Sequence, residues 1–157
     1  WTATDARGAA LDSGTIAVET PVNNSALVHS LDLQDLLEEQ TPRDTLVWLE
    51  LWSDDQLVSE NFATFARPKD FDFVDPEIAV NVTAREDGAF DLALSAKRPA
   101  LWTAIHLREV EASYSDNFIC LRPGVNRTVT MRLAVSMNAA ALREQLEIRS
   151  LYEFCLE

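Results

Sequence analysis

The stretch SYSDNFICLRPG at residues 113–124 decides the fold prediction. Phe118 and Cys120 alternate with further apolar neighbours, so both faces of an extended chain carry apolar side chains here. This pattern predicts a strand buried inside a β-sandwich rather than one lying on water. Pro123 and Gly124 predict a type II turn after the strand, because proline fixes φ at about −65° and glycine accepts a positive φ.

Composition limits the classes of protein to which the chain can belong. It has 157 residues, 47% of them hydrophobic, which allows one large domain or two small ones. A formal net charge of −13 disfavours nucleic-acid and membrane-surface partners. No apolar run approaches the ~20 residues of a membrane span, and no signal-peptide pattern is visible. We expect a soluble fragment or processed form, since the chain begins at Trp1, and the sequence does not predict its compartment.

Short alternating segments separated by turns fill most of the chain and predict an all-β class. Helical spacing is confined to Asp32–Gln40 and to a short segment that Asn138 would cap, ending at Gln145. The expected architecture is therefore a set of immunoglobulin-like antiparallel β-sandwich modules. The predicted strands lie at residues 1–4, 15–19, 26–31, 46–52, 57–65, 78–83, 90–95, 101–108, 113–122, 128–135 and 148–156.

Prolines and charges near residues 67–76 indicate a boundary between two modules. We predict a partial sandwich module at 1–68, a linker at 69–76 and a complete C-terminal sandwich at 77–157. The first module has fewer strands than the ~7 of an immunoglobulin-like sandwich. We therefore expect it to be truncated at its N-terminus, with an unpaired strand edge that invites self-association.

Several motifs of the sequence resemble those of β-mannosidases of glycoside hydrolase family 2. SDNF at 115–118 followed by LRPG at 121–124 resembles a signature of their C-terminal immunoglobulin-like domain. LEIRSLY at 146–152 is similar to the closing strand of that domain, and VSENF at 58–62 resembles the end of the preceding module. Ile119-Cys120 departs from the family, which more often has a second aromatic residue and an acid there. Exo-β-glucosaminidases of the same family have similar C-terminal domains.

The resemblance implies a parent enzyme that is a retaining β-mannosidase, which hydrolyses terminal β-mannosides in carbohydrate metabolism. Such enzymes use two glutamates with carboxyl groups about 5–5.5 Å apart, carried in this family by a (β/α)₈ barrel. The chain lacks the alternating strand–helix pattern of a barrel, and neither catalytic motif can be matched to it. We therefore expect no catalytic residue, cofactor or metal site here. The chain would be inactive alone, and its partner would be the barrel of the same parent chain.

Three tryptophans are the candidates for an interface or a sugar-stacking role: Trp48, Trp52 and Trp102. Trp48 and Trp52 share one face of the strand predicted at 46–52. We favour burial of these rings against a neighbouring domain, since large exposed apolar groups usually mark contacts. The alternative function is a carbohydrate-binding module that uses exposed tryptophan.

The polar pair Asp116 and Asn117 lies inside an apolar stretch and therefore needs hydrogen-bond partners. Either the pair reaches the active-site rim of the parent enzyme, or it bonds to backbone at the strand end, which we favour. Cys120 and Cys155 are too few for a disulfide framework. We expect two buried thiols, with a single bridge between the strands as the alternative.

Acidic and histidine side chains do not form a convincing catalytic or metal-binding set. Glu50, Glu109 and Glu111 are interpreted as parts of a solvated acidic surface, because the chain has 26 acidic residues. His29 and His106 lie in different predicted modules, without further ligands at metal-binding spacing, and we interpret them as ordinary strand histidines.

Overall fold

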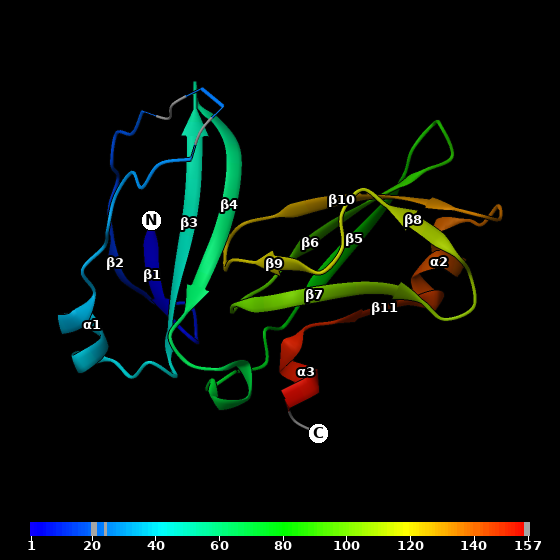
Figure 1. Ribbon diagram of the computed structural model, residues 1–157. Coiled ribbons are helices and arrows are strands. Elements are labelled where there is room, and N and C mark those ends of the chain that lie inside the picture. The colour runs from blue at the N-terminus through cyan, green and yellow to red at the C-terminus, as the bar shows by residue number, and fades with distance from the viewer. Residues whose placement is uncertain (20–21, 24, 156–157) are drawn as a thin grey trace. The chain divides into compact units, whose positions relative to one another are not determined.

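The computed structural model describes residues 1–19, 22–23 and 25–155. The chain divides into two compact units, Trp1–Asp72 (unit 1) and Phe73–Glu157 (unit 2), and each is described by itself (Figure 1). The described strand pairs are all antiparallel, and the helices are short. The predicted all-β class with immunoglobulin-like antiparallel modules is confirmed.

Unit 1 contains one four-stranded sheet in the order β2-β1-β3-β4. β3 and β4 form a hairpin in which Asp54 and Asp55 have φ values of 48° and 61°. Two consecutive positive φ values make a type I′ turn, whose twist matches that of antiparallel strands. The hairpin turn predicted between these strands is confirmed. The elements of unit 1 are β1 (Thr2–Asp5), β2 (Ala10–Ser13), α1 (Gln34–Glu39), β3 (Thr45–Ser53), β4 (Gln56–Thr64) and a 3₁₀ helix (Pro68–Asp70).

Two strands that the sequence predicts in unit 1 are wrong. Residues 15–19 and 26–31 form no strand, and the extra strand of the sheet is β2 instead. Most side chains in both segments are exposed, including those of Leu27 and His29, while Val18 and Leu31 are half-buried. Alternation records only which side chains are apolar, whereas a strand also needs a neighbour to pair with its backbone.

Unit 2 is a sandwich of a four-stranded sheet, ordered β5-β6-β10-β8, and a three-stranded sheet, ordered β11-β7-β9. Its strands are β5 (Ala79–Ala84), β6 (Phe90–Ser95), β7 (Ala100–Leu107), β8 (Ala112–Tyr114), β9 (Ile119–Leu121), β10 (Arg127–Leu133) and β11 (Leu146–Arg149). Its helices are α2 (Ala139–Gln145) and α3 (Leu151–Cys155).

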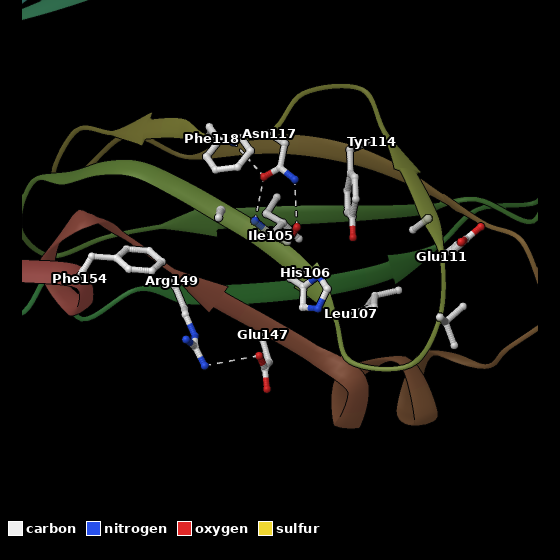
Figure 2. Close-up of a pocket in the computed structure, with 13 residues that line it drawn as sticks. Ile105, His106, Leu107, Glu111, Tyr114, Asn117, Phe118, Glu147, Arg149 and Phe154 are labelled. Carbon is white, nitrogen blue, oxygen red and sulfur yellow. Dashed lines mark hydrogen bonds and ion pairs between the residues drawn. The ribbon is translucent and has the colours of Figure 1, made fainter. Parts of the chain in front are cut away.

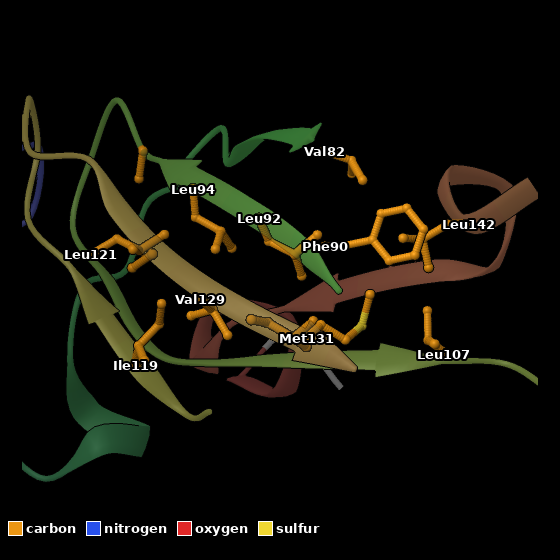
Figure 3. Close-up of a cluster of buried hydrophobic side chains, with 13 residues drawn as sticks. Val82, Phe90, Leu92, Leu94, Leu107, Ile119, Leu121, Val129, Met131 and Leu142 are labelled. Atoms are coloured by element: carbon orange, nitrogen blue, oxygen red, sulfur yellow. The ribbon is translucent and has the colours of Figure 1, made fainter. Parts of the chain in front are cut away.

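The hydrophobic core of unit 2 lies between these two sheets (Figure 3). β6 buries every second residue, including Leu92 and Leu94, as its alternation predicts. β7 and β9 contribute Ile105 and Leu121 from the other sheet, and α2 adds Leu142. Burying a side chain of this size stabilises a fold by about 1.5–3 kcal/mol, so this layer supplies the main stabilisation of the unit.

The stretch at residues 113–124 was predicted to be one strand, and this is wrong. It forms two short strands, β8 and β9, which belong to different sheets. The predicted type II turn is confirmed, because Val125 N–H donates to Arg122 O at 3.2 Å and Gly124 has a φ of 75°. The stretch therefore marks the place where the chain crosses from one layer to the other.

The C-terminal segment departs from the strand predicted at 148–156. β11 ends at Arg149, and the helix α3 follows it. The carboxylate of Glu153 accepts hydrogen bonds from the Ser150 N–H at 2.7 Å and the Ser150 hydroxyl at 2.8 Å. A serine followed three residues later by a glutamate begins a helix, because the glutamate satisfies an N–H that the helix leaves open.

Other local predictions fare unevenly. Asn138 caps α2 as predicted, since its side chain accepts a hydrogen bond from Ala141 N–H at 2.9 Å.

Cys120 and Cys155 both carry reduced thiols. Their predicted burial is wrong: Cys120 is half-buried and Cys155, on α3, is exposed. Cys155 is exposed because it lies on α3, which is partly solvated, rather than on a buried strand.

The boundary between the two units falls between Asp72 and Phe73, inside the segment 69–76 expected to be a linker. Asp72 N–H donates to Arg43 O at 2.8 Å, which attaches the first part of this segment to unit 1. Pro76 O accepts from the N–H groups of Lys97 and Arg98 at 2.9 and 3.2 Å, which attaches the last part to unit 2. The segment is therefore held at both ends.

Candidate functional site

The side chain of Asn117, just before β9, makes the hydrogen bonds that a strand backbone would otherwise make with β7. The ladder between β7 and β9 pairs Thr103 with Ile119, and two residues further along the same register Ile105 would lie opposite Asn117. Instead, the side chain of Asn117 makes both bonds: its Oδ1 accepts from Ile105 N–H at 2.8 Å, and its Nδ2 donates to Ile105 O at 2.9 Å. The backbone of Asn117 is thus released to leave the sheet while Ile105 stays satisfied.

Ser115 plays a similar part on the other sheet. Its N–H donates to Thr130 O at 2.8 Å, and its hydroxyl accepts from Thr130 N–H at 2.9 Å. Between the two sheets, Asp116 Oδ1 accepts from Asn117 N–H at 2.8 Å. The polar residues of the SDN motif therefore bond to backbone at the crossing between the layers.

Phe118 follows directly and projects its ring outward. Its φ is 56°, a left-handed conformation that is strained for a bulky residue and costs about 1–3 kcal/mol. Its N–H donates to Asn117 Oδ1 at 2.8 Å, which helps to hold this conformation. The ring is 66% exposed. The crossing thus fixes an apolar ring on the surface of unit 2.

A groove of about 830 Å³ opens beside this ring, entirely within unit 2 (Figure 2). Its floor is the outer face of β7 and β11, where His106 pairs with Glu147 and Ala104 with Arg149. Residues directly opposite on antiparallel strands point to the same face, so these four side chains share one surface. Phe118 and Phe154 lie toward one end of the groove in Figure 2, and Tyr114 and Glu111 toward the other.

The polar side chains of the groove differ in how they are paired. Glu147 accepts a hydrogen bond from Arg108 at 2.8 Å and lies 3.7 Å from Arg149. Within the described part of the chain, the hydroxyl of Tyr114 and the ring of His106 make no hydrogen bond. Burial raises the pKa of Tyr114, because removal from water disfavours the phenolate. Its hydroxyl therefore stays protonated and able to donate.

The three candidate tryptophans are not brought together. Trp48 is only 6% exposed; its Nε1 donates to Thr4 Oγ1 at 3.1 Å and its ring packs against Phe62 with centroids 6.1 Å apart. Trp52 is 55% exposed, and its Nε1 donates to Glu50 Oε2 at 3.4 Å. Trp48 thus has no exposed face to offer a sugar, although Trp52 shares its side of the strand.

Trp102 lies on unit 2 at an irregularity of the β7–β9 ladder between Ala100 and Thr103. Its φ is 47°, and its backbone N–H donates to Cys120 Sγ at 3.4 Å. A bulge of this kind redirects a side chain out of the regular alternation. The ring is partly exposed and does not line the unit 2 groove.

Unit 1 has a second groove, of about 680 Å³. Trp1 and Trp52 both line it, together with Leu49, Leu51 and residues 15–18, 28–29 and 31. Trp52 is therefore the candidate tryptophan that combines exposure with a concave surface. The interface and sugar-stacking roles of the tryptophans stay predictions.

Within residues 1–19, 22–23 and 25–155, no three His, Cys, Asp or Glu side chains gather in a way that would hold a metal ion. None of the described helices is long and apolar enough to cross a membrane.

Sequence reasoning missed Arg149 and Phe154 as parts of the groove. Arg149 reaches it because β11 pairs with β7, a contact between segments about forty residues apart that no local pattern encodes. Phe154 reaches it because α3 follows Ser150 rather than a continued strand. The serine–glutamate spacing at 150 and 153 is the signal that would have predicted this helix.

Comparison with known families places both units. Residues 73–154, more than half of the chain, match the mannosidase Ig-fold domain. The chain belongs to the mannosidase Ig-fold family. Residues 1–70 match the mannosidase Ig/CBM-like domain, so the two family matches follow each other along the chain. The resemblance to the immunoglobulin-like domains of a mannosidase is therefore confirmed.

One solved structure has a similar fold over almost the whole of this chain. The crystal structure of β-D-mannosidase from Dictyoglomus thermophilum matches with a TM-score of 0.77 and 17% sequence identity. The match covers 94% of this chain and 17% of that one, so the chain spans under a fifth of the enzyme's length. At this identity the likeness establishes the fold. Comparison with curated protein sequences gives no match.

Proposed function

We propose that the chain is the non-catalytic accessory region of a retaining β-mannosidase-like glycoside hydrolase of family 2. The parent enzyme would hydrolyse terminal β-mannosides in carbohydrate metabolism, and this region would support its catalytic barrel. The observation that carries the proposal is the succession of two mannosidase-type domains, at residues 1–70 and 73–154. An accessory domain of a related exo-β-glucosaminidase is the nearest variant of the same proposal.

The proposal assigns the chemistry to residues outside this chain. Retaining glycosidases need two carboxyl groups about 5–5.5 Å apart on either side of the scissile bond. The groove of unit 2 holds Glu111 and Glu147, but Glu147 is engaged by arginine side chains and the floor around it is an ordinary sheet face. The purified chain is therefore expected to release no nitrophenol from 4-nitrophenyl β-mannoside.

The parent gene provides the decisive experiment. Its product is expected to contain a (β/α)₈ barrel with two suitably placed glutamates and to hydrolyse 4-nitrophenyl β-mannoside. Replacing either glutamate by glutamine should abolish turnover while leaving residues 1–157 folded. A parent protein without such a barrel, or turnover by the isolated chain, would contradict the proposal.

A second candidate function is a carbohydrate-binding module that uses exposed tryptophan. The observation that favours it is the position of Trp52 in the groove of unit 1. Tryptophan fluorescence during titration with mannooligosaccharides should then change, and Trp52→Ala should remove the change while Trp102→Ala keeps it. An unchanged spectrum would leave the accessory role as the function of this unit.

Self-association through a strand edge also stays a proposal. β4 is an edge of its sheet, nine residues long and exposed over most of its length. Edge strands offer backbone groups to which another strand can pair.

A further inference from the structure

Two aromatic rings at one end of the unit 2 groove are held in exposed positions by their own local structure. Phe118 is oriented by Asn117, and its ring is 66% exposed. Phe154 is 57% exposed and lies on α3, whose start is fixed by the bonds between Ser150 and Glu153. Large apolar groups that a fold keeps in water usually mark a contact surface. The strained backbone of Phe118 points the same way, since such strain clusters at functional positions.

The middle and the other end of the groove carry polar side chains that can form further hydrogen bonds. In the part of the chain that the structure describes, His106, Tyr114 and Glu111 make no side-chain hydrogen bond. The group includes a donor, an acceptor and an imidazole that can be either. A ligand with hydroxyls, which both donate and accept, matches this mixture better than a ligand with one kind of group.

The shape and charge of the groove narrow the class of ligand. Its volume of about 830 Å³ falls within the ~300–1,000 Å³ of small-molecule sites, which are concave and mostly apolar with a few polar groups. Arg149, the arginine that lines the groove, lies 3.7 Å from Glu147, which also pairs with Arg108 outside the groove lining. With Glu111 nearby and a chain charge of −13, an anionic ligand is disfavoured.

We propose that this groove is a binding site for a neutral oligosaccharide. The C–H face of a sugar ring would pack on Phe118 and Phe154, and the hydroxyls of a following sugar would bond to His106, Tyr114 and Glu111. The site is separate from the Trp52 groove of unit 1. Binding of a sugar in this groove does not depend on the activity of the parent enzyme. The binding site and the accessory role in a β-mannosidase can therefore be disproved separately.

Titration of the ¹⁵N-labelled chain with mannotriose and, separately, cellotriose tests the proposal. Amide signals of residues 104–107, 110–118 and 147–154 are expected to shift with one saturable curve. Phe118→Gly is the main variant, because it removes the ring while glycine accepts the positive φ of this position. We expect it to weaken binding at least about tenfold, as the loss of a stacked ring does. His106→Ala should weaken binding several-fold.

The controls separate binding from folding and from other sites. Phe65→Ala removes an exposed phenylalanine from unit 1 and should leave the affinity unchanged. Binding of cellotriose alone would still support the groove, and the parent enzyme's specificity would then be decided by its hydrolysis assay. The proposal is overturned if neither sugar shifts these signals at millimolar concentration, or if Phe118→Gly binds like the unchanged chain. Shifts of the same signals on raising protein concentration without sugar would instead make this face an interface between copies, and would also overturn it.

Discussion

Strand β6 of unit 2 and strand β4 of unit 1 each contain four apolar residues, among six in β6 and nine in β4, but their surroundings differ. β6 buries every second residue in the core between two sheets, whereas the first six residues of β4 are all exposed. Both belong to four-stranded antiparallel sheets. The difference is the second layer: unit 2 has a facing sheet, and the described part of unit 1 has one sheet only. An alternating pattern therefore predicts burial only where another layer covers the apolar face.

The same contrast appears in how the two units treat asparagine. Asn117 of unit 2 bonds to the backbone of Ile105 across the sheet and to Phe118 N–H, its next neighbour. Among the residues that the structure describes, the side chain of Asn61 on β4 of unit 1 bonds only to Phe62 N–H, at 2.9 Å. The side chain of Asn117 thus connects two segments of a sheet, whereas that of Asn61 bonds only to the next residue of its own strand.

The largest difference is expected between two leucines. Leu92→Ala should lower the free energy of unfolding of unit 2 by about 3 kcal/mol, because it leaves a cavity in a closed core. Leu51→Ala, at an exposed position of β3, should lower that of unit 1 by less than about 1 kcal/mol. Amide hydrogen exchange, read residue by residue, assigns each loss to its unit. Equal losses would mean that unit 1 has a second layer after all.

The asparagine pair should differ by a smaller amount. Asn117→Ala leaves the N–H and C=O of Ile105 without their partners and should cost about 2 kcal/mol in unit 2. Asn61→Ala removes only the local bond to Phe62 N–H and should lower the free energy of unfolding of unit 1 by about 0.5 kcal/mol. Urea unfolding followed by exchange of the Ile105 amide measures the effect. If both variants lose the same stability, the crossing does not depend on the side chain of Asn117.

The smallest effect is expected from a surface ion pair, and it should depend on pH. Hydrogen bonds from Lys97 and Arg98, both at 2.6 Å, lower the pKa of Glu77 below its ordinary value of 4.5. The unfolded chain then binds more protons in this range, so this contribution is present at neutral pH and is lost as pH falls through the lowered pKa. Glu77→Gln should therefore reduce stability slightly at neutral pH and leave it unchanged in strong acid.

The control for this last prediction is Glu86→Gln, at an exposed glutamate of the same unit. Its thermal unfolding midpoint should follow that of the unchanged chain across the same pH range. A Glu77→Gln variant with the same pH profile as the unchanged chain would show that the pair with Lys97 and Arg98 contributes nothing measurable, as exposed pairs often do.

Much of the fold follows from local patterns in the sequence. Alternation predicts the strands β3, β5, β6, β7 and β10, and the Pro123-Gly124 and Asp54-Asp55 turns follow from residue types, the second of them predicting the return strand β4. Failures occurred where a local pattern competes with long-range contacts or with a cap. Residues 15–19 and 26–31 alternate but find no partner, and Ser150 with Glu153 begins a helix where alternation predicted a strand.

The candidate site was predicted only in part. The polar pair Asp116 and Asn117 in an apolar setting predicts bonds to backbone. The residues of β7 and β11 that complete the site were not predicted, because they become neighbours only when segments from 104–107 and 147–149 pair. The sequence also did not predict which side chains are exposed. Trp48 and Trp52 share one face of the predicted strand, yet Trp48 is buried and Trp52 is exposed.

The sequence alone determined that this protein is built of antiparallel strands in immunoglobulin-like modules, because side-chain alternation and turn residues act over a few neighbouring positions. Only the tertiary structure decided that residues 113–124 cross between two sheets and that Phe118, His106 and Phe154 line one groove. Those relations arise from the pairing of β7 with β9 and β11, and strand pairing depends on contacts between residues far apart in the chain.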